Sequence, residues 1–170
     1  MKKSDFINKS STFLAINSNS KKRNSRKVLD KVFITSNFKE TQKLGRDFAK
    51  VLEKGDVLYL YGDLGSGKTT FVRGLAEGLG VKQRIISPTF IIVRSYKLEV
   101  ISFYHVDLYR VNNEKDIKGL GLEEVINNPE NIVVIEWADK LKSFSPEKRI
   151  DLKFSYEKEK VRRIVFSLTT

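Results

Sequence analysis

Residues 62–69 read Gly-Asp-Leu-Gly-Ser-Gly-Lys-Thr, a complete G-x-x-x-x-G-K-[ST] phosphate-binding loop, and no other feature restricts the fold as strongly. The run at residues 57–61 before it is wholly apolar, as in a strand that is buried on both faces. After Thr69 apolar residues recur with helical spacing until Gly80, which predicts a helix that ends there. Strand, glycine loop and helix follow one another in the order that phosphate binding requires.

Each fixed position of this loop has a chemical reason. Gly62 and Gly67 allow positive φ, so that backbone N–H groups converge on phosphate oxygens where a Cβ atom would collide. Lys68 supplies a positive charge for the β and γ phosphates, and the hydroxyl of Thr69 suits a Mg²⁺ ion that bridges them. The loop therefore predicts binding of a nucleoside triphosphate together with Mg²⁺.

The bulk composition restricts the remaining choices. A chain of 170 residues is long enough for one domain with a substantial core. The absence of cysteine excludes disulfides and thiolate metal sites, and it fits a reducing, cytoplasmic location. The longest apolar run has five residues, whereas a membrane-spanning helix needs about 20. We therefore expect a cytoplasmic protein with no membrane segment.

The positive charge of the chain is concentrated at its start. Of the net charge of +11, residues 1–31 carry +7, with nine basic residues against two acidic ones. This segment is also rich in Ser and Asn and poor in apolar residues, so we expect a disordered basic tail. A solvated tail, a weak RNA contact and an organelle transit peptide are all compatible with it. A single P-loop domain is then expected over residues 32–170.

The segment between the tail and the loop predicts a strand and a helix. Residues 32–34 are an apolar run that is typical of an opening strand. Asn37 and Glu40 stand in a capping-box relation, which predicts the start of a helix. Gly55 is expected to end this helix.

The pattern after the loop helix predicts a mixed sheet. Residues 91–93 and 100–107 are typical of two antiparallel strands, and short helices are expected within residues 114–128. Residues 132–135 form another fully apolar run, which predicts a buried strand. Alternation over residues 150–165 predicts a C-terminal β-hairpin. The fold class is therefore α/β, a single P-loop domain with a mixed β-sheet flanked by helices.

Two carboxylates are candidates for chemistry beyond binding. Glu136 ends the buried run at residues 132–135, where an acid can reach a metal ion or its water. Strand alternation places His105 and Asp107 on one face, and two polar groups that continue an apolar face need partners or a cleft. His105 could be structural or functional. The single tryptophan, Trp137, could pack in the core or contact a nucleotide or a partner.

These pieces together resemble the TsaE family, the small P-loop ATPases of bacterial tRNA threonylcarbamoyladenosine synthesis. The matching strings stand in the order of the family and at similar spacings, at residues 61–74, 87–90, 105–110, 119–122 and 135–137. The phosphate loop alone is shared by many families, whereas this ordered set is highly specific. The resemblance fades beyond residue 140 and has no counterpart in the tail.

The resemblance implies roles for individual residues. Those implied to hold the phosphates are Gly65, Ser66, Gly67, Lys68, Thr69 and Thr70. Thr69 and Glu136 are implied to serve Mg²⁺, and Thr41 lies in a segment that approaches the nucleotide base. The residues implied to take part in turnover are Lys68, Asp107 and Glu136, with Trp137 flanking the site.

The resemblance also implies an activity and partners. The resemblance implies a slow ATPase that acts with the proteins TsaD and TsaB. These partners attach a threonylcarbamoyl group to adenosine 37 of tRNA. ATP hydrolysis is implied to reset that complex, so tRNA is contacted only indirectly.

Three rival functions require other sequence features. A GTPase is disfavoured because the chain has no Asn/Thr-Lys-x-Asp motif. A small-molecule kinase is expected to carry an arginine-rich lid, and the arginines here are scattered. A nucleotide-gated binding module without significant turnover remains an alternative.

Overall fold

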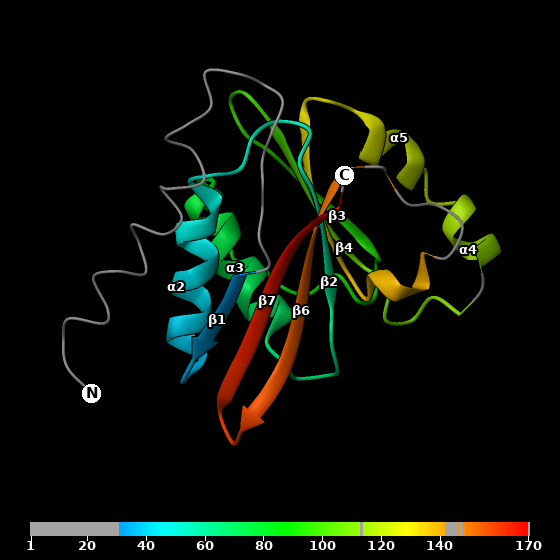
Figure 1. Cartoon of the computed structure of the whole chain (residues 1–170). Helices are drawn as coiled ribbons and strands as arrows, with labels where there is room; N and C mark the ends of the chain where they lie inside the picture. Colours follow the sequence, from blue (N-terminus) through cyan, green and yellow to red (C-terminus); the bar gives the residue numbers. More distant parts are fainter. Residues whose placement is uncertain (1–30, 113, 142–145, 147, 170) are drawn as a thin grey trace.

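The computed structural model describes residues 31–112, 114–141, 146 and 148–169, which build one seven-stranded mixed sheet with helices on both faces (Figure 1). The strands are β1 (Lys31–Thr35), β2 (Val57–Tyr61), β3 (Val93–Lys97), β4 (Ser102–Asp107), β5 (Asn131–Glu136), β6 (Arg149–Lys158) and β7 (Val161–Thr169). They lie in the order β1-β7-β6-β2-β5-β4-β3. The expected α/β fold with a mixed sheet is thereby confirmed.

The strand before the phosphate loop occupies the centre of the sheet. β2 pairs in parallel with β5 on one side and with β6 on the other, and β4 continues the parallel set beside β5. β3 and β7 run antiparallel to their neighbours β4 and β6, and β1 closes the sheet by pairing antiparallel with β7. A central parallel strand is covered on both faces, which explains its unbroken apolar run.

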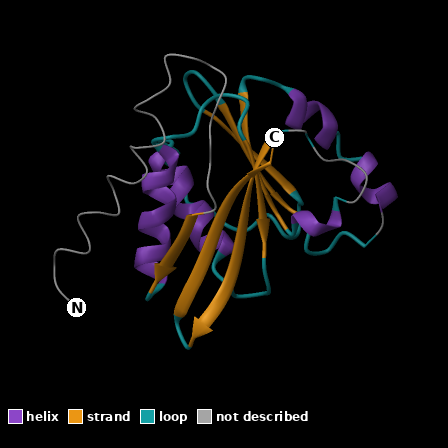
Figure 2. Cartoon of the chain, viewed as in Figure 1, coloured by secondary structure: helices purple, strands orange, loops and turns teal. Residues whose placement is uncertain are grey.

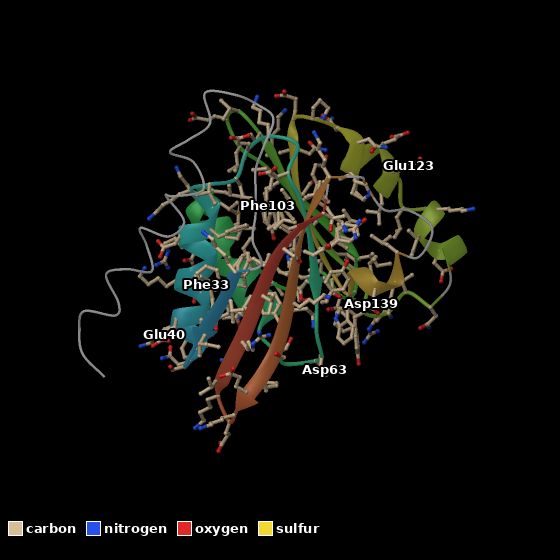
Figure 3. The ribbon with its side chains drawn as sticks, in the orientation of Figure 1. Phe33, Glu40, Asp63, Phe103, Glu123 and Asp139 are labelled. Atoms are coloured by element: carbon tan, nitrogen blue, oxygen red, sulfur yellow. The ribbon has the colours of Figure 1, made fainter. Side chains whose placement is uncertain are left out.

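Two layers of helices cover the sheet (Figure 2). α2 (Phe38–Ala49) and α3 (Lys68–Gly78) lie on one face, and α4 (Glu114–Lys118), α5 (Leu122–Asn127) and the 3₁₀ turn η1 (Ala138–Lys140) lie on the other. Figure 3 shows Glu40 on α2 and Glu123 on α5 at opposite outer surfaces. Alternation along β2 sends Leu58 and Leu60 into one core and Val57 and Tyr59 into the other.

The two helices beside the phosphate loop pack unusually closely. A Cβ atom on Gly45 of α2 would lie 2.1 Å from the carbonyl oxygen of Phe71. A Cβ atom on Gly74 of α3 would lie 1.8 Å from the carbonyl oxygen of Gln42. Because only glycine allows this approach, these two residues fix α3, and with it the end of the phosphate loop, against α2.

Two expected boundaries were wrong. α2 ends at Ala49 and not at Gly55, because Lys50, Val51 and Leu52 donate to carbonyls only three residues back. Gly55 lies beyond the helix with φ 83°, and its N–H donates to the carbonyl of Asn131 at 2.8 Å.

The second error concerns the start of β3, which begins at Val93 and not at residue 91. Ile91 and Ile92 form a turn instead, because the N–H groups of both donate to the carbonyl oxygen of Pro88. Ile92 has φ 64°, a rare conformation for a β-branched residue. Strand pairing of the turn is prevented because its N–H groups are already used.

The other element predictions are confirmed. α3 stops before Gly80, which has φ 91°, and Asn37 caps α2 by accepting from the N–H of Glu40 at 3.0 Å. β6 and β7 form the C-terminal hairpin. Residues 1–30 of the expected tail lie outside the described residues, and Lys31 already belongs to β1. Among the helices that the structure describes, none has the length and apolarity to cross a membrane.

Candidate nucleotide site

The phosphate loop leaves the carboxyl end of β2 and leads directly into α3. Gly62, Gly65 and Gly67 have φ of 132°, 80° and 106°, the conformations that the motif requires. The loop borders an open cleft of about 360 Å³. Of the residues implied to hold phosphates, those that line this cleft are Gly65, Gly67, Lys68, Thr69 and Thr70, and Ser66 is buried behind them.

The Lys68 side chain is folded back onto its own loop. Its Nζ donates to the carbonyl oxygens of Gly62 at 2.5 Å and Asp63 at 2.9 Å, and it lies 4.1 Å from the centre of the Trp137 ring. Burial lowers the pKa of Lys68, and the carboxylate of Glu136 opposes that shift. Within the described ranges this buried ammonium group forms no ion pair with a carboxylate, and a phosphate would supply an anionic partner.

Glu136 joins the loop to the neighbouring strand. It pairs in register with Leu60 at the end of β2, and it is 2 % exposed. Its Oε2 accepts a hydrogen bond from the Thr69 hydroxyl at 2.9 Å, and its Oε1 lies 2.8 Å from Nε2 of His105. The two carboxylate oxygens are thus held by two different elements, α3 and β4.

His105 is completely buried, and its second ring nitrogen defines the tautomer. Nδ1 has no hydrogen-bond partner within the described part of the chain. A buried N–H without an acceptor costs more than a buried lone pair, so the proton lies on Nε2 and is donated to Glu136. The structural role of His105 is therefore to orient one oxygen of that carboxylate.

Asp107 lies beside Glu136 in the register of β4 and β5, with 3 % of its surface exposed. Its Oδ2 accepts from the hydroxyls of Ser87 at 2.5 Å and Thr89 at 2.6 Å, and its Oδ1 accepts from the N–H of Tyr109 at 3.0 Å. These bonds fix the segment that precedes β3 to the end of β4. The carboxylate thus closes one wall of the cleft.

Trp137 lines the cleft beside the phosphate loop. Its backbone has φ 60°, and its N–H donates to the carbonyl of Leu60 at 3.1 Å. Its ring lies 5.1 Å from the ring of Tyr109, and it is half-buried. Trp137 both lines the cleft and packs against the core beneath α4 and α5, so its position is compatible with each alternative that the sequence left open.

Comparison with known proteins places this arrangement in a family. The family model described as threonylcarbamoyl adenosine biosynthesis protein TsaE matches residues 35–164. This chain belongs to the TsaE family. The tRNA threonylcarbamoyladenosine biosynthesis protein TsaE of Bacillus subtilis is 38% identical over 133 residues, which is 78% of this chain and 82% of that protein. The TsaE protein of Haemophilus influenzae is 35% identical over 119 residues, 67% of this chain and 75% of that protein.

A solved structure supports the same assignment. The crystal structure of YdiB from Bacillus subtilis superposes with a TM-score of 0.72 at 34% sequence identity. The match covers 86% of this chain and 90% of that one. The two proteins therefore share their fold over most of both chains.

Thr41, the residue that the TsaE resemblance placed near the base, lies on the other side of the loop from Glu136. It is completely buried on α2, and its hydroxyl shares a hydrogen bond of 2.8 Å with the hydroxyl of Thr35 on β1. Its Cγ2 lies 3.6 Å from the position of a Cβ atom on Gly67. Thr41 thus packs against the loop, and its hydroxyl is used inside the protein.

The C-terminal hairpin contacts the loop as well, which the sequence reasoning missed. The Tyr156 hydroxyl of β6 donates to the carbonyl of Gly65 at 2.5 Å, and Arg162 of β7 packs on Gly67. Figure 3 shows Asp63 of the loop and the tip of the hairpin at the same end of the molecule. We call this flank, with Thr41, Tyr156 and Arg162, the hairpin side, and the flank with Asp107 and Glu136 the carboxylate side.

The donors of the carboxylate side fit Mg²⁺. Thr69 and Glu136 offer hard oxygen atoms that face each other at 2.9 Å in the cleft. The described residues contain no group of three or more His, Cys, Asp or Glu side chains that could hold a metal ion by itself. Mg²⁺ binds in this way, through one or two protein oxygens together with water and substrate phosphates.

Proposed function

We propose that this protein binds ATP with Mg²⁺ and hydrolyses it slowly, in the synthesis of threonylcarbamoyladenosine at position 37 of tRNA. It acts with the proteins TsaD and TsaB, which carry out the modification, and its ATP hydrolysis resets their complex. Its location is the cytoplasm, and tRNA is reached only through the complex. The names of the similar TsaE proteins from Bacillus subtilis and Haemophilus influenzae support the pathway.

One observation carries the proposed activity: the Thr69 hydroxyl bonds to Glu136 at the end of the strand next to the phosphate loop. A Mg²⁺ ion supplies neutralisation of charge on the β and γ phosphates when it is bound. Thr69 and Glu136 would hold it, and Lys68 would turn from the loop carbonyls towards the phosphates. Backbone N–H groups at residues 65–70 would bind the phosphate oxygens.

The hydrogen bonds of Asp107 support slow turnover by the free protein. A carboxylate has about four acceptor positions, and three of those of Asp107 are taken by Ser87, Thr89 and the N–H of Tyr109, which restrains its orientation. We infer that binding of the partner proteins moves the segment at residues 87–92 and lets this carboxylate turn towards the attacking water. That step makes the ATPase dependent on TsaD and TsaB.

ATP hydrolysis in a reconstituted system tests this function. Wild type, Lys68→Ala and Glu136→Ala are compared alone and with TsaD, TsaB and tRNA, with release of phosphate and formation of the modified adenosine as readouts. We expect stimulation of wild-type hydrolysis by the partners. Loss of one oriented group raises the barrier by several kcal/mol, so Glu136→Ala is expected to fall well beyond tenfold.

The rival functions predict different outcomes of the same assay. If the partners bind and modification proceeds without any consumption of ATP, the protein is a nucleotide-gated binding module. If the terminal phosphate appears on a small acceptor, the protein is a kinase. Equal hydrolysis by wild type and Glu136→Ala contradicts the role given to Glu136.

A further inference from the structure

The rim of the cleft on the carboxylate side carries an exposed aromatic ring. Phe90 lines the cleft, yet 80% of its surface is exposed. The turn that carries it is held in place by its neighbours. The Thr89 hydroxyl donates to Asp107 at 2.6 Å, and the N–H of Ile91 donates to the carbonyl of Pro88 at 2.9 Å. The ring therefore stands at a defined place on the edge of the cleft.

The side chain of Arg110 lies on this ring. Its Cζ atom is 4.2 Å from the ring centre of Phe90, and Tyr109, the residue before it, also lines the cleft. Arg110 is exposed, and within the described ranges its guanidinium pairs with no carboxylate. A cation on an aromatic face is weakly held at an exposed site. The guanidinium is thus kept beside the cleft by a contact that a stronger partner can replace.

The wall of the cleft on this side is negatively charged. Among the described residues that line the cleft, Lys68 is the only Lys or Arg, whereas the carboxylates of Asp107 and Glu136 both lie in its wall. A Mg²⁺ ion held by Thr69 and Glu136 would bridge the last two phosphates, which places the terminal phosphate on the carboxylate side. Like charges repel in such a site, so a further cation would stabilise this phosphate.

Lys140 also lies near this wall, but its charge is already used. Its Nζ is 5.8 Å from the ring centre of Tyr109, and it donates to the carbonyl oxygens of Tyr109 and Val111. Arg110 has no such bonds within the described ranges. Its planar guanidinium can donate to two phosphate oxygens at once, and such charge-assisted bonds are stronger than an exposed stack on a ring. Arg110 is therefore the cation that a terminal phosphate can recruit.

We propose that Arg110 turns from the ring of Phe90 into the cleft when ATP binds, and that its guanidinium donates to oxygens of the terminal phosphate. ADP lacks this phosphate and leaves Arg110 on Phe90. Arg110 thereby makes the site distinguish ATP from ADP, and Phe90 keeps the guanidinium close to the cleft while no triphosphate is bound. This inference rests on the proposed binding of ATP and adds a residue to that same site.

Isothermal titration of the full-length protein with two nucleotides tests this role. ADP and the ATP analogue with an imido group between its last two phosphates, which resists hydrolysis, are titrated with Mg²⁺ into wild type, Arg110→Ala and Arg163→Ala. We expect Arg110→Ala to raise the Kd for the analogue about tenfold and to leave the Kd for ADP within about twofold. Arg163 lies on β7, 4.0 Å from Glu157, and does not line the cleft, so its variant is expected to match wild type.

Two results overturn the role of Arg110. Equal weakening of both nucleotides means that it does not discriminate the terminal phosphate, and unchanged binding of both means that it stays outside the site. Arg110→Gln, which removes the charge but keeps a polar side chain, covers the case in which the alanine variant fails to fold. The same selective loss is expected, and wild-type affinity of this variant for the analogue contradicts the proposal. Failure of wild type to bind either nucleotide would refute the proposed function instead.

Discussion

The two flanks of the phosphate loop differ in the hydrogen-bond partners of their polar side chains. On the carboxylate side, Asp107 and Glu136 are buried and every described contact to their oxygens comes from a positioned donor. On the hairpin side, the hydroxyl of Thr41 is used internally and the Nε of Arg162 has no acceptor in the described chain. A satisfied network keeps its geometry without a ligand, whereas an unsatisfied donor gains from one. We therefore expect the chemistry on the carboxylate side, where the acceptors are already positioned.

Lys68→Ala should have the largest effect on nucleotide binding, because Lys68 lies where the phosphates contact the loop between its two flanks. Removal of its charge is expected to weaken ATP binding about 100-fold, the loss typical of charge-assisted bonds in a desolvated site. Titration calorimetry should show the same loss with tripolyphosphate. Lys82→Ala on the exposed surface is the matched control. A loss confined to ATP would contradict the placement of Lys68 at the phosphates.

His105→Leu tests the carboxylate side without touching the nucleotide. Without the Nε2–H donor, one oxygen of Glu136 loses its orientation, and the partner-stimulated kcat is expected to fall about tenfold. The Kd for ATP should change by less than about threefold. His105→Gln retains an N–H donor and should recover much of the rate. Equal defects in the leucine and glutamine variants would show that His105 matters only for packing.

Thr89→Val tests the restraint on Asp107. The variant keeps the shape of the side chain but removes a charge-assisted hydrogen bond of 2.6 Å, which should lower the free energy of unfolding by about 1–2 kcal/mol. Urea denaturation measures this change. Phe90→Ala, at a side chain that is 80% exposed, should leave the unfolding free energy nearly unchanged. A Thr89→Val protein as stable as wild type would contradict the restraint.

Tyr61 gives the smallest effect and tests how the hairpin is attached to the strand of the loop. Its hydroxyl donates to Asp151 of β6 at 3.0 Å, and burial followed by the Asp151 carboxylate raises the pKa of Tyr61 to about 12. The unfolded phenol, with a pKa near 10, loses its proton first, so the contribution of Tyr61 to stability is lost as pH rises from about 10 to 12. Unfolding of Tyr61→Phe should depend less on pH in that window. The same pH dependence of unfolding in wild type and Tyr61→Phe would contradict this attachment of the hairpin to β2.

The sequence predicted the features that local patterns encode. The loop, the stop at Gly80 and the burial of β5 follow from short runs of residues, and the structure has all three. Gly55 was misplaced because its N–H bonds to Asn131, a partner that no local pattern shows. The turn at Ile92 was missed because Pro88 takes both N–H groups of an apolar run that is otherwise typical of a strand.

The candidate site likewise combines features that the sequence predicted with features that it could not predict. The positions of Thr69 and Glu136 followed from the motif and from the end of a buried run, whereas the contact of Tyr156 with Gly65 joins residues 91 positions apart. It depends on the pairing of β6 with β2, which composition and alternation cannot specify. The bond between His105 and Glu136 was likewise hidden until the register of β4 and β5 was known.

The most direct test of the central claim, that the carboxylate side performs chemistry, is single-turnover hydrolysis of ATP bound to the complex with TsaD and TsaB. Wild type and Glu136→Ala are compared at saturating nucleotide, and the Kd for ATP of each is measured separately. We predict a rate at least about tenfold lower for Glu136→Ala, with a Kd within about threefold of wild type. Equal rates, or a Kd that weakens as much as the rate falls, would contradict the claim.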